Sequence, residues 1–236
     1  SIRGFHKEYY EAWNACDILS IVEEDKESYY KSFVTPETLV KFIHVPTTED
    51  MAQGRLFIPR RFKQNVALIY GDNNPNHPLI AIACAAKIGK DVLLMEVDRD
   101  GKLDAIKRLF PNTIFRSTSK QSLYNHLRIL GKSVIHFYPT EWIGTARQNI
   151  SCAITGTPCI GSRESHTQRR LYPDWLAFSP YDIQGMTEAA RRIISSEREY
   201  DDVTRNAFNL AQFYNLKNTK HRFSSAVERA QSAKQS

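Results

Sequence analysis

Short runs of Val, Ile and Leu recur along the middle of the chain, and segments with helical spacing of apolar residues separate them. These runs predict strands at residues 65–70, 91–97, 113–116 and 133–138. The helical segments between them lie at residues 78–88, 102–110 and 119–130. The strands lack alternation of polar and apolar residues, which is typical of a parallel sheet buried on both faces. Right-handed crossovers then predict a doubly wound α/β domain.

The pattern continues toward the C-terminus with the same alternation of elements. We expect a helix from about 144 to 155, strands at 158–161 and 175–178, and helices at 182–196 and from 201 to 214, the last continuing to about 230. Gly156 is suited to end the first of these helices because glycine tolerates left-handed backbone angles, and Pro158 cannot continue it.

The first sixty residues predict a smaller α/β unit. Its expected order is a helix at 1–16, a strand at 17–22, a helix at 23–33 and a strand at 40–45, followed by a linker at 47–63. This unit is too small to form a domain by itself.

Composition agrees with a globular protein. Hydrophobic residues make up 42% and charged residues 25% of the 236 residues, and no apolar run reaches the roughly 18–20 residues that span a bilayer. The chain begins at Ser1 without a basic and apolar leader, so we expect a signal peptide to be absent or already removed. We expect a cytoplasmic location. The four cysteines lie at wide spacing inside apolar segments, which favours buried thiols in a reducing compartment over disulfides or a zinc site.

The net charge of +6 is concentrated near the C-terminus. Residues 203–236 hold one acidic residue, Glu228, against six basic ones: Arg205, Lys217, Lys220, Arg222, Arg229 and Lys234. This segment is either a solvated helical face or a surface that attracts nucleic acid or an anionic membrane.

Common α/β enzyme motifs are absent from the sequence. The turn after the strand at 65–70 has a single glycine, Gly71, where a dinucleotide-binding fold carries a Gly-rich fingerprint. There is also no Walker loop and no Gly-x-Ser-x-Gly elbow. His136 lies inside a predicted strand and is expected to be a core histidine.

Four segments together resemble the carboxyl-terminal half of a retaining glycosyltransferase of the GT-B fold, in the family-4-like group. They are residues 15–22 with 41–46, residues 66–71, residues 153–162 and residues 178–182. The most specific is Ala-Ile-Thr-Gly-Thr-Pro-Cys-Ile-Gly-Ser at 153–162, which is similar to the family's Ala-Met-Ala-Cys-Gly-Thr-Pro-Val-Ile-Gly-Ser.

The resemblance implies a Rossmann-like donor domain at 61–200, a partial acceptor-domain unit with linker at 1–60, and a C-terminal helical segment at 201–236 that packs back on that unit. It also implies transfer of a hexosyl group from a nucleotide sugar such as a UDP-sugar to an unknown acceptor. Neither a metal nor a cofactor is expected, and the nucleotide sugar is a co-substrate. No residue stands out as catalytic, and the family's acceptor-side groups would lie upstream of Ser1.

Donor binding is expected where loops meet the carboxyl ends of the strands and the amino end of the helix at 144–155, because a helix amino end attracts phosphate. The candidate donor-binding residues are Gly71, Asn73, Asn74, His77, Arg116, Thr140, Glu141, Trp142, Gly144, Thr145, Arg147, Ser151 and Arg163.

Two features depart from the family pattern. The family has a pair of glutamates eight residues apart, and Ile143 and Ser151 stand at those positions, with Glu141 two residues before the first. The loop at 72–77 also lacks the family's phosphate-binding Arg and Lys, so neutralisation would fall to Arg116, Arg147 or Arg163. These departures leave two alternatives open: a catalytically degenerate nucleotide-recognition or scaffold protein, and a glycosyltransferase acting on DNA bases through the basic C-terminal segment.

Overall fold

The computed structural model describes residues 11–21, 26–43, 54–70, 77–95, 102–118, 121–141 and 146–233. The chain divides into two compact units, one formed by residues 1–49 and 213–236 and the other by residues 50–212. The sequence predicted boundaries at residues 60 and 200, so the larger unit takes in additional residues on both sides. Among the described residues, no helix is both long enough and apolar enough to cross a membrane.

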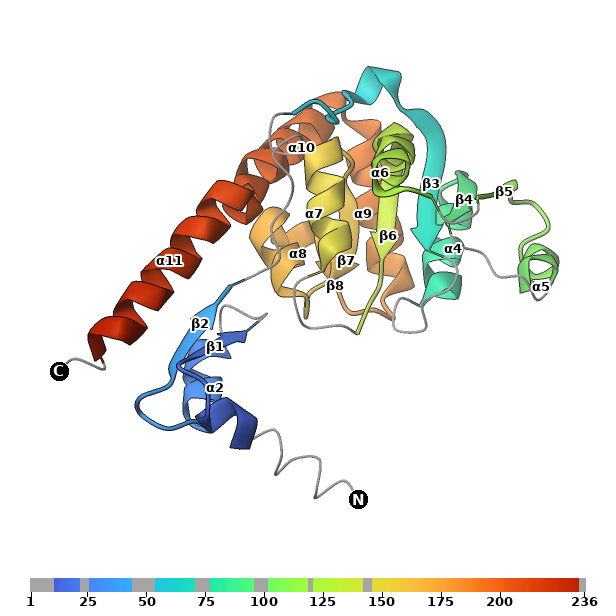
Figure 1. Cartoon of the computed structure of the whole chain (residues 1–236). Coiled ribbons are helices and arrows are strands. Elements are labelled where there is room, and N and C mark those ends of the chain that lie inside the picture. Colours follow the sequence, from blue (N-terminus) through green and yellow to red (C-terminus); the bar gives the residue numbers. More distant parts are fainter. Residues whose placement is uncertain are drawn as a thin grey trace. The chain divides into compact units, whose positions relative to one another are not determined.

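The larger unit contains a parallel sheet of six strands with helices on both faces (Figure 1). The strands are β3 (Gln64–Tyr70), β4 (Asp91–Met95), β5 (Phe115–Thr118), β6 (Ser133–Tyr138), β7 (Cys159–Ser162) and β8 (Ala177–Phe178). Their spatial order is β5-β4-β3-β6-β7-β8, and every neighbouring pair is parallel. This order confirms the predicted doubly wound sheet.

The helices of this unit are α4 (Pro78–Lys87), α5 (Lys102–Leu109), α6 (Leu123–Lys132), α7 (Arg147–Thr155), α8 (His166–Leu171), α9 (Ile183–Ser195) and α10 (Glu197–Ala211). Short 3-10 turns are η2 (Arg60–Phe62), η4 (Asp174–Leu176) and η5 (Gln212–Tyr214). Helices α6 and α7 pack side by side, and α4 packs against α9 (Figure 1). Since the strand order reverses between β3 and β6, right-handed crossovers place α4 and α7 on opposite faces of the sheet.

The centre of the sheet is buried, as the apolar residues of its central strands predict. All six residues of β6 are buried, and Leu68, Ile135 and Ile160 on three adjacent strands are completely inaccessible. Burial of such side chains is worth roughly 1.5–3 kcal/mol each, so the centre of the sheet is the main source of stability in this unit.

The turn after α7 has the predicted geometry. Gly156 follows Thr155 with φ of 68°, in the left-handed region, and the N–H of Thr157 donates to the carbonyl of Cys152 at 2.9 Å. Strand β7 begins one residue after Pro158. Glycine thus ends the helix because it adopts this conformation without a Cβ clash.

The smaller unit pairs two short parallel strands, β1 (Ile18–Ile21) and β2 (Leu39–Phe42). Its helices are α2 (Glu27–Lys31) and α11 (Leu216–Ala233), and residues 11–14 are also helical. Helix α11 packs on both strands, and the ring of Phe42 stacks on that of Phe213 with a centroid distance of 6.2 Å. Residues 1–10 of the helix predicted at 1–16 lie outside the described residues, and residues 15 and 16 are not helical.

Several predicted elements were wrong in detail. No helix was predicted between the strands at 158–161 and 175–178, but α8 begins at His166. Its residues are polar, so apolar spacing could not reveal it; Gln168 is nevertheless fully buried because its amide donates to the carbonyls of Cys159 and Leu176. The predicted strand at 175–178 is the turn η4 followed by the two-residue β8.

Two helices, α6 and α10, begin at other residues than predicted, and a serine caps each of them. Helix α6 begins after Ser122, whose hydroxyl accepts from the N–H of Asn125 at 3.4 Å, rather than at 119. Helix α10 begins at Glu197 rather than 201, because the Ser196 hydroxyl accepts from the N–H of Glu199 at 3.2 Å. Three cysteines are buried as predicted, but Cys16 is exposed.

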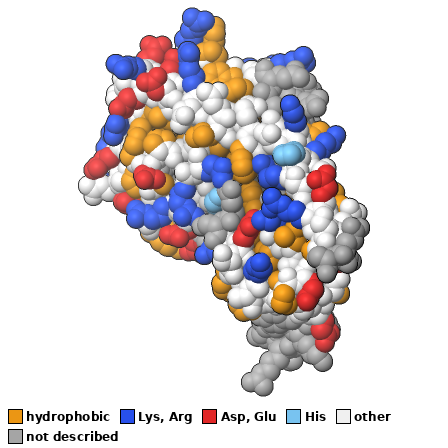
Figure 2. All heavy atoms as spheres, turned by 90° about the vertical axis from the view of Figure 1, so that its left-hand side faces the viewer, with side chains coloured by type: hydrophobic (Ala, Val, Ile, Leu, Met, Phe, Trp, Pro, Cys, Tyr) orange, Lys and Arg blue, Asp and Glu red, His pale blue; other side chains and the backbone are white. Residues whose placement is uncertain are grey.

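Charged side chains of both signs are interspersed on the surface. Figure 2 shows Lys and Arg side chains at many places on one face, with acidic and hydrophobic side chains between them. The excess of positive charge therefore does not appear in this view as a single uninterrupted basic area.

Candidate functional site

The order of the strands marks one position on the sheet for ligand binding. Strands β3 and β6 are neighbours, and the chain proceeds from them in opposite directions across the sheet. Loops that follow such a pair diverge and leave a crevice at the carboxyl ends of the strands. Residues after Tyr70 and after Tyr138 are therefore the first candidates for a ligand site.

Side chains from these two loops and from a third meet at this edge. His77 follows the loop after β3, Glu141 lies three residues beyond β6, and Tyr181 lies three residues beyond β8. The Nε2 atom of His77 lies 3.4 Å from Oε1 of Glu141, and the hydroxyl of Tyr181 donates a hydrogen bond to the same oxygen. The rings of His77 and Tyr181 are 5.1 Å apart between centroids.

This His77-Glu141-Tyr181 cluster remains open to solvent. The side chain of Glu141 is 57% exposed and Tyr181 is 60% exposed. The hydrogen bond to the Glu141 carboxylate raises the pKa of Tyr181, since the bond favours the protonated phenol. An exposed carboxylate oriented by two partners can accept hydrogen bonds from the hydroxyls of a ligand.

His77 has an unusual backbone. Among the described residues it is the one non-glycine residue with positive φ, at 41°, and it caps α4 directly before Pro78. A non-glycine residue in the left-handed region costs on the order of 1–3 kcal/mol, and such residues cluster at functional sites. The strain adds a second, independent reason to place a site here.

Many predicted donor-binding residues cannot be placed. Gly71, Asn73, Asn74, Trp142, Gly144 and Thr145 lie outside the described residues. Of the others, the structure brings His77 and Glu141 into contact.

The remaining predicted residues are spread over several positions. Thr140 is fully buried beside Tyr138, and Ser151 is half-buried in the second turn of α7. Arg147 at the start of α7 and Arg163 after β7 are exposed. Arg116 is two strands away from the crevice, and its guanidinium lies 3.5 Å from the carboxylate of Asp91 at the amino end of β4. Arg147 and Arg163 are thus better placed than Arg116 to face an anionic ligand.

Tyr181 was not among the predicted donor-binding residues. Its signal was present, because Tyr181 follows a short strand of the parallel sheet and so falls at the same carboxyl edge as the other loops. Two further side chains are hydrogen-bonded near this edge: the hydroxyl of Tyr70, at the end of β3, and Nε2 of His126 on α6.

A buried group of metal-ligand type lies within the sheet and α7. A ring nitrogen of His136 and the sulfurs of Cys152 and Cys159 lie within 4.8 Å of one another, and all three side chains are inaccessible. Such donors suit zinc or copper(I). Nδ1 of His136 donates to the carbonyl of Leu68 at 2.8 Å, and burial lowers the pKa of His136 to about 4. Burial also raises the pKa of the Cys152 thiol well above its usual value, so His136 and Cys152 are both neutral at neutral pH. His136 is therefore the core histidine that was predicted.

Comparison with known proteins gives no match at the level of sequence. No family model matches the chain, and no curated protein matches it.

Solved structures, by contrast, match over nearly all of its length. Sucrose-phosphate synthase from Thermosynechococcus elongatus is 14% identical with a TM-score of 0.78, over 98% of this chain and 62% of that one. UDP-forming α,α-trehalose-phosphate synthase from Burkholderia xenovorans is 12% identical with a TM-score of 0.75, over 95% of this chain and 64% of that one. A TarM mutant from S. aureus, solved with UDP, is 9% identical with a TM-score of 0.76, over 94% of this chain and 46% of that one.

The chain thus spans between about half and two thirds of the length of these proteins. At such low identity the matches establish the architecture alone. The strand order, with its reversal between β3 and β6, and these matches together show that the chain has the GT-B fold of glycosyltransferases.

Proposed function

We propose that the larger unit binds a nucleotide-sugar donor, such as a UDP-sugar, and that the protein transfers the sugar to an acceptor. The observation that carries this proposal is the His77-Glu141-Tyr181 cluster at the crevice of a GT-B sheet. Several proteins with the same fold were solved with UDP, among them TarM and the pneumococcal O-GlcNAc transferase GtfA.

In this proposal Glu141 accepts hydrogen bonds from hydroxyls of the donor. It lies two residues before the position at which the GT-B family that the sequence resembles has the first of two glutamates. Its Oε1 atom contacts Tyr181 and His77, which orient the carboxylate. Its second carboxylate oxygen then binds a sugar or ribose hydroxyl. His77 and Tyr181 act as positioning residues.

The diphosphate of the donor requires positive charge. Arg147 at the amino end of α7 and Arg163 after β7 are exposed and supply it together with the helix amino end. Stabilisation of the departing diphosphate by these groups needs no metal, so we propose a metal-independent transfer. Retention of activity in excess EDTA tests this point.

Substitution of Glu141 tests the donor site. Glu141→Ala is expected to weaken binding of the matching UDP-sugar by about 10–100-fold, since a hydrogen bond to a charged group is worth about 1.5–3 kcal/mol. Glu141→Gln keeps a hydrogen-bond acceptor and should lose less affinity than Glu141→Ala. Tyr181→Phe should also lose less affinity than Glu141→Ala, because it removes only the hydrogen bond that positions Glu141.

Calorimetry with UDP and UDP-sugars measures these effects. If Glu141→Ala loses affinity for the UDP-sugar but not for UDP, Glu141 contacts the transferred sugar. If it loses equal affinity for both, Glu141 contacts the nucleotide. Glu188→Ala, an exposed carboxylate on α9 that contacts Gln184, is the control. Wild-type binding by Glu141→Ala would contradict the proposed role.

Calorimetry with a panel of UDP, GDP and their sugars tests the proposal as a whole. If no nucleotide gives saturable heat with well-folded protein, the enzyme proposal fails and a degenerate scaffold remains. A DNA-directed enzyme instead predicts DNA binding that falls steeply as salt concentration rises.

A further inference from the structure

Three side chains of metal-ligand type meet inside the larger unit, between the sheet and α7. His136 on β6 and Cys159 on β7 are direct neighbours in the parallel register, and α7, which packs on β7, contributes Cys152. A ring nitrogen of His136 and the two sulfurs lie within 4.8 Å of one another, and all three side chains are inaccessible to solvent. Donors from three different elements are thus gathered in one part of the core.

The tautomer of His136 leaves one ring nitrogen free to bind a metal. The Leu68 carbonyl, which can only accept, lies 2.8 Å from Nδ1, so Nδ1 carries the proton. Burial lowers the pKa of His136 to about 4, so the ring is neutral at pH 7 and Nε2 carries no proton.

This free nitrogen, Nε2, has no use in the fold itself. It is buried and has no hydrogen-bond partner among the described residues. A buried polar atom without a partner calls for an explanation, because such atoms are rare in folded proteins. Donation from the other ring nitrogen to a backbone carbonyl, as from His136 to Leu68, is the usual arrangement in metal-binding histidines.

Two neighbouring side chains suit the cysteines to bind as thiolates. The amide of Asn149 donates to the sulfur of Cys159 at 3.5 Å. Burial raises the pKa of the Cys152 thiol, and the ammonium of Lys63 acts in the opposite direction. Because a metal-bound sulfur keeps its negative charge, an N–H donor and a nearby cation both stabilise the bound state.

We propose that His136, Cys152 and Cys159 bind one thiolate-preferring metal ion, zinc or copper(I), which ties α7 to the sheet. The ion replaces the two thiol protons, which pass to solvent, and no electron is transferred. Bonds of about 2.3 Å to sulfur and about 2.0–2.1 Å to nitrogen require donor atoms roughly 3.5–4 Å apart. Small rotations of side chains already within 4.8 Å bring the three donors to that spacing.

Zinc and copper(I) differ in the charge and in the number of ligands that they bring. Zinc with two thiolates and a neutral imidazole forms an uncharged group, which suits an apolar core, but structural zinc takes a fourth ligand. Among the described residues the group offers three donors. Copper(I) with the same donors carries one negative charge, and Lys63, which interacts with Cys152, offsets it.

An ion at this position is structural rather than catalytic. His136 lies two residues before the end of β6 and is inaccessible, so the ion stays inside the core, away from a ligand in the crevice. The site therefore does not depend on nucleotide-sugar transfer, and it is compatible with a transfer step that needs no metal.

The metal content of the full chain tests this site. Because a buried ion enters as the chain folds, zinc, copper or cobalt(II) is supplied during expression, and the protein is purified without a metal-affinity step. Elemental mass spectrometry should find about one zinc or copper ion per chain. Cobalt(II), as a substitute for zinc, should give a thiolate-to-metal charge-transfer absorption band.

Variants of the three ligands identify where the ion lies. Cys152→Ala and Cys159→Ala are expected to reduce the metal content about tenfold or more, since each removes a ligand. His136→Asn keeps an N–H that can donate to Leu68 but lacks Nε2, so it should lose metal as well. The matched control is Cys84→Ala, at a fully buried cysteine on α4 outside the group, which should keep the wild-type content.

The metal that is retained tells zinc from copper(I), and either result supports the site. The site is overturned if wild-type protein retains neither metal in stoichiometric amount, or if the cobalt(II) protein lacks the thiolate band. These two measurements decide even if a variant fails to fold. Equal metal content in the wild type and in folded Cys152→Ala would also overturn it. A failure of UDP to bind would overturn the proposed sugar transfer and leave this site unaffected.

Discussion

Gly156→Ala is expected to destabilise the larger unit by about 2–5 kcal/mol. The left-handed φ of 68° costs an L-residue roughly 1–2 kcal/mol. An added Cβ would lie 2.8 Å from the Phe57 ring, whose edge packs on Phe208, and forced overpacking costs about 1–3 kcal/mol more. Thermal or urea denaturation measures the loss, which corresponds to a fall of about 2–4 °C per kcal/mol.

Gly89→Ala is a matched control for the cost of placing an L-residue at a left-handed φ. Gly89 lies in the same unit with a φ of 65°, and a Cβ there would meet nothing within 4 Å. It should therefore lose only the conformational part, and the difference between the two variants measures the contact with Phe57. Equal losses in both variants would show that the Phe57 ring moves aside without cost.

Lys63 is expected to make the stability of the larger unit rise with pH between about 7 and 9. Its ammonium donates to the carbonyl of Gly131 at 2.6 Å and to the hydroxyl of Thr157 at 3.0 Å, close to the carboxyl ends of α6 and α7. Burial lowers the pKa of Lys63 from 10.5 to about 7, while Cys152 acts in the opposite direction.

The sign of this effect follows from proton binding. Between pH 7 and 10.5 the unfolded chain keeps the proton that the folded chain has lost, so raising the pH favours the folded state. One pKa unit corresponds to about 1.4 kcal/mol, so the gain from pH 7 to 9 is at most about 2–3 kcal/mol. Above pH 9 the effect reverses in part, because burial raises the pKa of Cys84 to about 11 and the unfolded thiol ionises first.

Lys63→Met should remove most of this slope, whatever its effect on stability at pH 7. Lys132→Met, at an exposed lysine near the end of α6, should keep the wild-type slope. Urea denaturation of the three proteins between pH 7 and 9 provides the measurement. A wild-type slope in Lys63→Met would show that another group titrates in this range.

Much of the fold could be predicted because its signals are local. The runs at 65–70 and 133–138 are apolar except for Asn65, Ser133 and His136, and β3 and β6 occupy nearly these residues. The Gly-Thr-Pro turn marks both the end of α7 and the start of β7, since the conformational limits of glycine and proline act within one or two residues.

Where prediction failed, the deciding contacts come from distant residues. Helix α8 is polar along its sequence, and Gln168 is buried only because the carbonyls of Cys159 and Leu176 accept its amide protons. Arg60, Arg61 and Lys63 were expected to be part of a linker. Lys63 instead lies among helix ends contributed by residues 131 and 155–157. No local pattern reports such partners.

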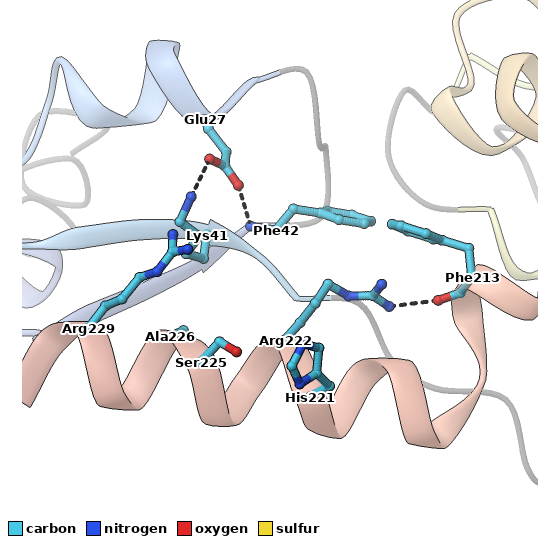
Figure 3. A pocket seen from close by; sticks show the side chains of 9 residues that line it. All are labelled: Glu27, Lys41, Phe42, Phe213, His221, Arg222, Ser225, Ala226 and Arg229. Atoms are coloured by element: carbon cyan, nitrogen blue, oxygen red, sulfur yellow. Dashed lines mark hydrogen bonds and ion pairs between the residues drawn. The ribbon is translucent and has the colours of Figure 1, made fainter.

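The residues of the candidate site were likewise predicted only in part. His77 and Glu141 could be proposed from their places after strands, whereas Tyr181 is separated from Glu141 by forty residues and reaches it only because β8 lies in the same parallel sheet as β6. The cavity between β2 and α11 (Figure 3) was not predicted, since residues 41–42 and 221–229, which line it, are remote in sequence.

The sequence by itself determined the α/β class, the order of most strands and helices, the turn at Gly156 and the resemblance to GT-B glycosyltransferases. These follow from apolar periodicity and from the backbone limits of individual residues, which act over short stretches. The tertiary structure decided which polar side chains meet, namely the His77-Glu141-Tyr181 cluster and the partners of the buried Lys63. Such meetings depend on strand order and helix packing, because burial and charge pairing are properties of the folded chain.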